Sequence, residues 1–270
     1  MSENSGPQVI KRPQDAPQAS KDAPAASKEH DNAKFMTAHD RERKWPNVRP
    51  KLAATLILLD NSGPVPKVLM GKRHAGHKFM AGKFVFPGGR IEAADRKMQA
   101  IAPLHAVVEE KLAKRRVKPS KSRARALALA AIRETFEETG LVLGRPGKVD
   151  KVPDGDWADY VKHGFAPDLS EVRFIARAIT PPKRPKRFDT TFLCIDAKWI
   201  AHRVEGVVTA DTELVELVWV PLKEAQELDL PHITSVVLKE LEGRIADGMK
   251  HEHPTPFYYE KQRTWFREEL

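Results

Sequence analysis

Blocks of apolar residues separated by polar turns run along the chain from about residue 50 onwards. LAATLILL (52–59) and KVLMGKR (67–73) flank the turn sequence NSGPVP, which predicts a hairpin of two buried strands. FVFPGG (84–89) predicts a short strand that ends in a tight glycine loop. Apolar runs rich in β-branched residues predict three later strands, in 171–179, 190–199 and 213–221.

The longest predicted helix is RALALAAIRETFEETG (125–140). Alanine, leucine, arginine and glutamate favour helix throughout it, and Gly140 stands where a helix commonly stops. Shorter helices are predicted in 155–165, 222–228 and 233–248. Strands on both sides of one long helix, with helices at the end, predict an α/β protein, a mixed sandwich.

The two ends of the chain differ in pattern from its middle. Residues 1–48 are rich in Pro, Ala, Gln, Lys and Ser without apolar periodicity, which predicts a disordered tail with no secretion signal. The folded domain is expected over 49–250, with a basic helical insertion at 96–132. A C-terminal extension (251–270) carries clustered aromatic residues, which we expect to dock on the core or on another copy of the chain.

The net charge of +9 is unevenly distributed. Segment 96–132 holds ten Lys and Arg residues against Glu109 and Glu110, so it carries most of the excess. A localised basic element suits a phosphorylated ligand or a polynucleotide, although a solvated helical face is an equal alternative. The single cysteine, Cys194, lies in an apolar run that predicts an inert buried thiol and fits a cytoplasmic location. The longest apolar stretches are too short to cross a membrane.

The strongest chemical signal lies on the long predicted helix. Glu134, Glu137 and Glu138 stand at positions i, i+3 and i+4, so their carboxylates share one face. Like charges at this spacing repel, and a hard cation such as Mg²⁺ or Mn²⁺ would compensate for them. Arg133 can reach Glu137 one turn later and hold its carboxylate. An exposed acidic helix with ordinary ion pairs is the alternative.

Two glycines and this helix together resemble the Nudix box. The matching residues are Gly88-Gly89, Asp95 and the run from Arg133 to Leu141. Thr135 stands where the family has an aliphatic residue and Asp95 where it has glutamate. The 37 residues of segment 96–132 replace seven in the family pattern.

The segment before the glycines resembles the signature of coenzyme A diphosphatases. His74 and Lys78 depart from that signature, where the family has serine and arginine. Later segments are similar to a branch of these enzymes that also interrupts its Nudix box, namely 179–182, 187–190, 213–214 and 219–220. The positions that match the signature are Arg73, Gly82, Phe86, Pro87, Gly88 and Gly89.

This resemblance implies the Nudix fold, an α/β/α sandwich around a mixed β-sheet, here with a helical insertion. It also implies metal-dependent hydrolysis of a diphosphate, with Mg²⁺ or Mn²⁺ held by Glu134, Glu137, Glu138 and the carbonyl of Gly88. Arg133 would orient one of these ligands. Glycine at Gly89 would let the backbone approach metal and phosphates closely.

The box leaves the catalytic base and the substrate contacts open. Later acidic residues, Glu205, Asp211 and Glu213, are candidate bases, and Glu213 is preferred. Arg73 and Lys78 are expected to bind phosphate, because the resemblance and their positive charge both indicate this role. Arg187 and Asp189 are expected to be either substrate contacts or loop anchors.

Coenzyme A or an acyl-coenzyme A, cleaved to 3′,5′-ADP and 4′-phosphopantetheine, is the leading predicted substrate. ADP-ribose, NADH or another nucleoside diphosphate derivative is the alternative, because the signature departs from its pattern at two positions. An RNA-end hydrolase or RNA-binding protein is less favoured, since the basic insertion lacks interleaved aromatic residues. The insertion separates the glycine pair from the acidic helix, so its ends are expected to lie near the active site. Its charge is expected to attract anionic substrates, and a helix that only covers the core is the alternative. A homodimer remains open.

Overall fold

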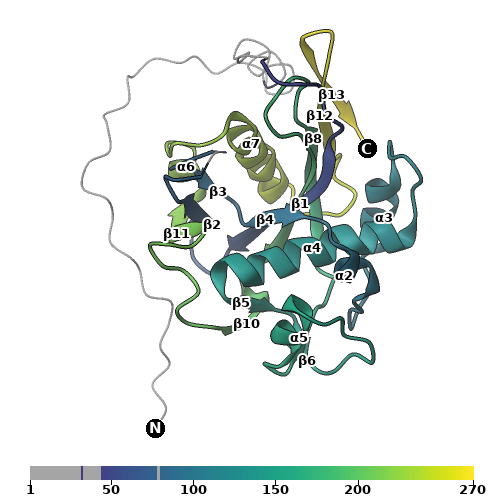
Figure 1. The fold of residues 1–270 in the computed structure, drawn as a ribbon, viewed down its shortest axis with the longest axis vertical. Coiled ribbons are helices and arrows are strands. Elements are labelled where there is room, and N and C mark those ends of the chain that lie inside the picture. Colours follow the sequence, from purple (N-terminus) through teal and green to yellow (C-terminus); the bar gives the residue numbers. More distant parts are fainter. Residues whose placement is uncertain (1–31, 33–43, 78–79) are drawn as a thin grey trace.

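A computed structural model describes residue 32 and residues 44–77 and 80–270 of the chain. Most of the expected tail, 1–48, and the predicted phosphate ligand Lys78 lie outside these described residues. Within them, nine strands form one mixed sheet (Figure 1). Seven strands make its main path, in the order β11 (Leu214–Pro221), β2 (Lys67–Arg73), β1 (Lys51–Asp60), β9 (Phe188–Asp196), β8 (Arg173–Ile179), β12 (Pro256–Lys261) and β13 (Thr264–Glu269).

Two short strands branch from the main path of this sheet. Strand β3 (Phe84–Val85) pairs with β2, and β4 (Gly88–Arg90) pairs with β1. The pairs β1–β9 and β12–β8 are parallel, and the other pairs are antiparallel. The predicted hairpin of β1 and β2 and the three later strands are confirmed.

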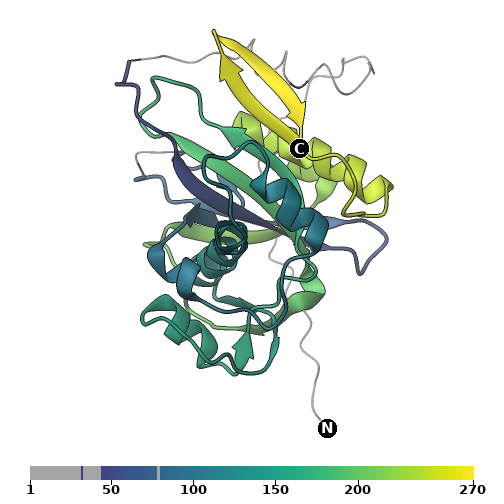
Figure 2. The same ribbon diagram turned by 90° about the vertical axis from the view of Figure 1, so that its right-hand side faces the viewer.

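Helices cover both faces of the sheet (Figures 1 and 2). One face carries α4 (Lys121–Thr139) and α3 (Ala106–Ala113), and the other carries α7 (His232–Ala246). The architecture is therefore an α/β/α sandwich around a mixed sheet, as predicted. None of the described helices is both long and apolar enough to span a membrane. The smaller elements are α2 (Ala93–Lys97), α5 (Asp156–Val161), α6 (Leu222–Ala225), η1 (Ala197–Trp199), and the strand pairs β5 (Leu141–Leu143) with β10 (Ile200–Arg203) and β6 (Arg145–Pro146) with β7 (Phe165–Ala166).

The two-residue period of the strands decides which side chains face which layer. On β1, Leu56 and Leu58 pack into the core below α4, whereas Ile57 and Leu59 pack into the core below α7. Cys194 on β9 also packs below α7, where burial raises the pKa of its thiol to about 12. The prediction of an inert core thiol agrees with this position.

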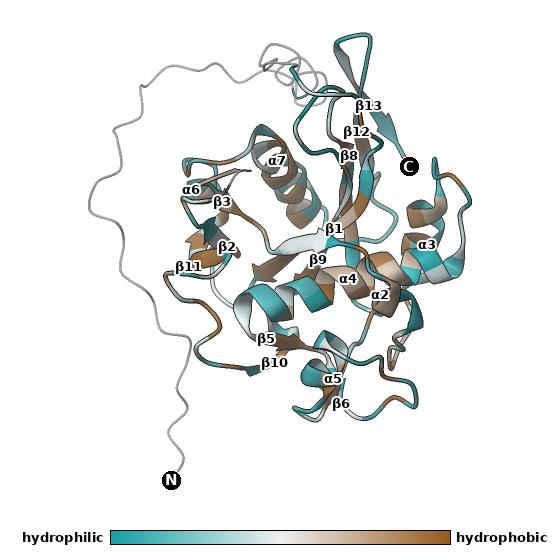
Figure 3. Cartoon of the chain, viewed as in Figure 1, coloured by the Kyte–Doolittle hydropathy of each residue, from teal (hydrophilic) through white to brown (hydrophobic). Residues whose placement is uncertain are grey.

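Helix α4 begins within the basic insertion and ends at the predicted stop. The hydroxyl of Ser120 accepts a hydrogen bond from the backbone N–H of Arg123 at 3.2 Å and caps its first turn. Gly140 closes it with a φ of +74°, a conformation that suits glycine. The helix changes from hydrophobic in its middle to hydrophilic near β5 (Figure 3). That hydrophilic end carries the Nudix-box glutamates.

The C-terminal hairpin β12–β13 joins the main sheet, because β12 pairs with β8. Phe257 and Tyr258 are buried there, so the aromatic cluster docks on the core, which is one of the two predicted docking sites. The hairpin itself was not predicted. Its turn residues, Gln262 and Arg263, have φ values of +51° and +66°. Glycine and asparagine usually occupy such turns, so the sequence lacked the expected signal.

Candidate functional site

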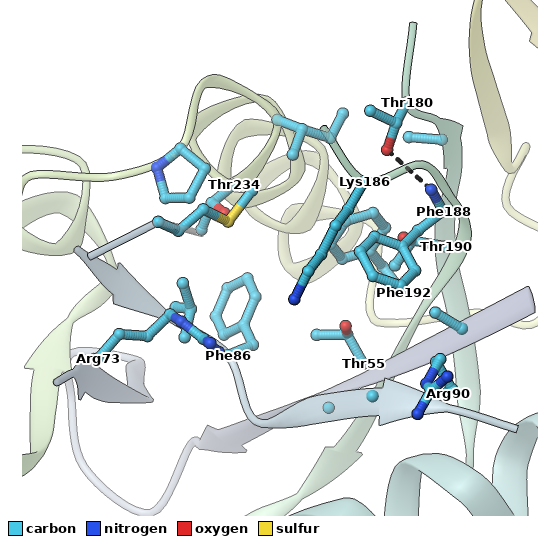
Figure 4. Close-up of a pocket in the computed structure, with 18 of the residues that line it drawn as sticks. Thr55, Arg73, Phe86, Arg90, Thr180, Lys186, Phe188, Thr190, Phe192 and Thr234 are labelled. Carbon is cyan, nitrogen blue, oxygen red and sulfur yellow. Dashed lines mark hydrogen bonds between the residues drawn. The ribbon is translucent and has the colours of Figure 1, made fainter. Parts of the chain in front are cut away.

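A cavity of about 1000 Å³ opens over β1, β8 and β9, at the start of α7 (Figure 4). Strand β4 and the hydrophilic end of α4 form another part of its wall. Glu134, Glu137 and Glu138 all line it, so the predicted carboxylate face is directed at one open space. Other predicted residues that line it are Arg73, Gly88, Gly89, Arg133 and Glu213.

Arg133 holds this end of the helix through a buried ionic network. Its guanidinium donates to Glu137 Oε1 at 2.7 Å, which confirms the predicted contact one turn later. It also donates to both carboxylate oxygens of Asp95, at 2.9 and 3.1 Å. Asp95 is fully buried and accepts a third hydrogen bond from the indole of Trp157 at 3.0 Å. The aspartate in the box therefore fixes the arginine that positions Glu137.

The two glycines bring β4 against the acidic face of α4. The backbone N–H of Gly88 donates to Glu138 Oε2 at 3.0 Å. A Cβ atom at Gly89 would collide with the carboxylate of Glu134. A residue without a side chain is therefore needed for this contact, in agreement with the predicted close approach of the backbone.

The three glutamates carry more negative charge than their surroundings balance. Burial, aided by the charge of Glu213, raises the pKa of Glu138 well above its usual range. Burial also raises the pKa of Glu134. It raises the pKa of Glu137 to about 7, although the contact with Arg133 acts to lower it. Their ionised forms would become more stable if positive charge entered the cavity.

The chemistry of this cluster suits a hard divalent cation. Its donors are carboxylate oxygens, the ligands that Mg²⁺ and Mn²⁺ prefer. Across the described ranges, no group of three or more His, Cys, Asp or Glu side chains is placed so that it could hold a metal ion. The carboxylates of Glu134 and Glu137 contact Arg133, and that of Glu138 accepts from the backbone of Gly88. The residues therefore fit a hard cation in the chemistry of their donors.

One of the three candidate bases lies at the cavity. Glu213 lines it and accepts a hydrogen bond at 2.6 Å from Arg73, another predicted site residue. Glu205 instead pairs with Arg203 at 3.3 Å, and neither Glu205 nor Asp211 lines the cavity. The structure thus brings the preferred candidate to the same space as the glutamates of α4.

Arg187 and Asp189 do not line the cavity. Arg187 donates to Asn47 Oδ1 at 2.9 Å and to the carbonyl of Thr180 at 3.0 Å. The carboxylate of Asp189 accepts two hydrogen bonds from Arg177, both at 2.7 Å. These contacts agree with the alternative expectation, that of anchors.

No residue of the basic insertion (96–132) lines the cavity. Two of its cations instead bind other parts of the chain. Lys111 donates to the backbone carbonyls of His251 and His253 at 2.8 and 2.7 Å, and Arg116 donates to Thr191 Oγ1 at 2.7 Å. These contacts agree with the expectation that the insertion covers the core. Its ends adjoin the cavity as predicted, because Asp95 and Arg133 on either side of it bond to each other and Arg133 lines the cavity.

Sequence reasoning missed cavity residues in the loop before β9 and on β9 itself. Lys186 of the loop lines the cavity, as do Phe188, Thr190 and Phe192 on β9 (Figure 4). Two-residue alternation along β9 was the signal that could have found the three strand residues.

No family model matches the chain, and no curated protein matches it. Among solved structures, it is similar to a Nudix hydrolase from Alicyclobacillus acidocaldarius, with 28% identity and a TM-score of 0.53 over 71% of this chain and 90% of that one. It also matches the Nudix domain of Shewanella oneidensis NrtR, solved with ADP-ribose, with 13% identity and a TM-score of 0.40 over 79% of this chain and 97% of that one.

The likeness to the Alicyclobacillus protein covers most of the described domain and agrees with the predicted fold. The two glycines and the charged residues of α4 all line the cavity, although 37 inserted positions lie between the two parts of the pattern in the sequence. The chain therefore shares its fold with a solved Nudix hydrolase.

Proposed function

We propose that this enzyme hydrolyses the diphosphate of a nucleoside diphosphate linked to another moiety, and that coenzyme A or an acyl-coenzyme A is its substrate. The observation that carries the proposal is the position of four glutamates, three on α4 and Glu213 before β11, on one cavity. A volume of about 1000 Å³ suits a nucleotide derivative. Arg73 and Phe86 of the coenzyme A signature line the same space, which supports the finer assignment.

In this proposal, Glu134, Glu137, Glu138 and the carbonyl of Gly88 hold Mg²⁺ or Mn²⁺. The cation supplies positive charge that polarises the diphosphate. Arg133 and the Gly88 N–H keep two of these carboxylates in place. Their burial favours cation binding over solvation of three separate charges.

Glu213 acts as the base. It accepts a proton from the attacking water while the water oxygen forms a bond to phosphorus. The bridging P–O bond breaks, and the leaving phosphate takes the electron pair of that bond. Arg73 positions Glu213 through their 2.6 Å contact. For coenzyme A the products are 3′,5′-ADP and 4′-phosphopantetheine.

The test is a panel of coenzyme A, dephospho-coenzyme A, acetyl-coenzyme A, ADP-ribose, NADH and capped RNA, each with Mg²⁺ or Mn²⁺. We expect the highest kcat/KM for a coenzyme A compound, and ¹⁸O from labelled water in one of its two phosphate products. A preference for ADP-ribose or NADH would replace the substrate but retain the reaction. No hydrolysis of any diphosphate in the panel would refute the reaction itself.

A further inference from the structure

The loop between β8 and β9 is closed at its base. The backbone N–H of Thr180 donates to the carbonyl of Phe188 at 2.9 Å, and the N–H of Phe188 donates back to Thr180 Oγ1 at 3.1 Å (Figure 4). Arg187 ties the same base to Val48 through a 2.8 Å hydrogen bond to its carbonyl. The residue directly before Arg187 is therefore presented by a fixed backbone.

Lys186 lies in the loop directly before β9, and it lines the cavity together with Arg184 and Pro185. Arg187 points outward to its anchors, and Lys186 and Phe188 on either side of it both line the cavity. Figure 4 shows the Lys186 side chain extended into the open space, with its amino group directed toward Thr55 on β1. Thr55 is the register partner of Gly88, whose N–H holds Glu138. The amino group thus faces the strands that carry the box glycines.

Three other cations around this space are already paired with carboxylates. Arg73 pairs with Glu213, Lys83 pairs with Asp229, and Arg133 is enclosed by three carboxylates. No carboxylate pairs with Lys186 in the part of the chain that the structure describes. A lysine amino group carries three donors and no acceptor, so its missing partner is an anion.

We propose that Lys186 is a binding site for a phosphate group of the substrate. This inference rests on the proposed function for the identity of the substrate, but not for the existence of the site. The amino group approaches the bound phosphate from the β8–β9 loop, while α4 and β4 hold the cation on their own side. Lys186 would then determine affinity for diphosphates without taking part in the proton transfer at Glu213.

The test measures binding of inorganic pyrophosphate by calorimetry in EDTA, where no divalent cation contributes. K186Q should weaken binding about tenfold or more, because a charge-assisted contact to phosphate is lost. K183Q is the matched control: Lys183 is an exposed lysine of the same loop that does not line the cavity. Its affinity should stay within about twofold of the unaltered protein.

Kinetics give a second measurement on whichever diphosphate the panel identifies. K186Q should raise KM about tenfold with little change in kcat, and K186R should recover part of the loss. Lack of pyrophosphate binding by the unaltered protein, equal binding by K186Q, or equal losses in K186Q and K183Q would overturn the site. The pyrophosphate titration decides this even if no substrate in the panel is hydrolysed, so the two proposals fail separately.

Discussion

Two buried clusters of arginine and carboxylate show how opposite charge balances serve different purposes. At the cavity, the single guanidinium of Arg133 faces three carboxylates, those of Asp95, Glu134 and Glu137. Behind β9, two guanidinium groups, from Arg116 and Arg177, share the single carboxylate of Asp189. The two clusters use the same groups in reversed proportions.

Their remaining partners explain the difference. The second cluster completes its hydrogen bonds with the protein, because Arg177 also donates to the carbonyl of Arg115 at 3.1 Å and Arg116 to that of Leu112 at 2.8 Å. Its excess positive charge is therefore enclosed, and it joins the insertion to the sheet. The first cluster leaves the carboxylates of Glu134 and Glu137 at an open cavity, whereas Asp95 is fully buried. An acidic excess beside a cavity is suited to a ligand, and an enclosed basic excess is suited to structure.

The largest expected effect comes from removing Glu138, a further carboxylate of α4 that lines the cavity beside this cluster. Glu138→Gln should keep the fold but lower kcat by about a thousandfold, or roughly 4 kcal/mol in activation free energy. Steady-state kinetics at saturating Mg²⁺ and circular dichroism would measure the two effects. E110Q, on the exposed face of α3, should leave both unchanged. Near-normal turnover of E138Q would exclude the box as the active site.

A smaller effect, on stability instead of chemistry, is expected in the enclosed cluster. Asp189→Ala would leave Arg116 and Arg177 buried without their carboxylate, at a cost of about 3 kcal/mol. Urea unfolding should show this loss, while the folded fraction keeps its kcat because Asp189 does not line the cavity. D211A removes an exposed aspartate and should stay within about 0.5 kcal/mol. Normal stability with lost activity would instead give Asp189 a catalytic role.

The smallest effect concerns pH in the metal-free protein. Burial raises the pKa of Glu137 to about 7, so the folded state favours its protonated form. This contribution is fully present below the unfolded pKa of about 4.3 and is lost as pH rises through 7. The melting temperature in EDTA should therefore fall by about 2–4 °C between pH 5 and pH 8, on the order of 1 kcal/mol.

Added Mg²⁺ should offset more of this loss at pH 8 than at pH 5, because the ligands must be ionised to bind it. E137Q should reduce the dependence on pH, and E110Q should not. An identical pH profile for E137Q and the unaltered protein would contradict the charge imbalance at the cavity.

Local patterns predicted the elements of the site well. The glutamates of α4 share a face because their spacing alone determines this in any helix, and Gly140 ends the helix where its flexibility predicts. The resemblance at Gly88 and Gly89 likewise predicted a close approach of backbone and carboxylate. The C-terminal hairpin was missed because Gln262 and Arg263 give no turn signal.

The sequence by itself determined the acidic helix, the central strands and the residues of an interrupted Nudix box. Only the tertiary structure decided that the glycines and the glutamates of α4, separated by the insertion of 37 residues, meet at one cavity. It also decided that no residue of the positive insertion lines that cavity. It also decided that Lys186 faces the cavity whereas Arg187 faces away. The physical reason is that helix faces depend on neighbours within one turn, whereas strand faces and layer positions depend on pairing between distant segments. A shift of one residue in that pairing would exchange the two sides.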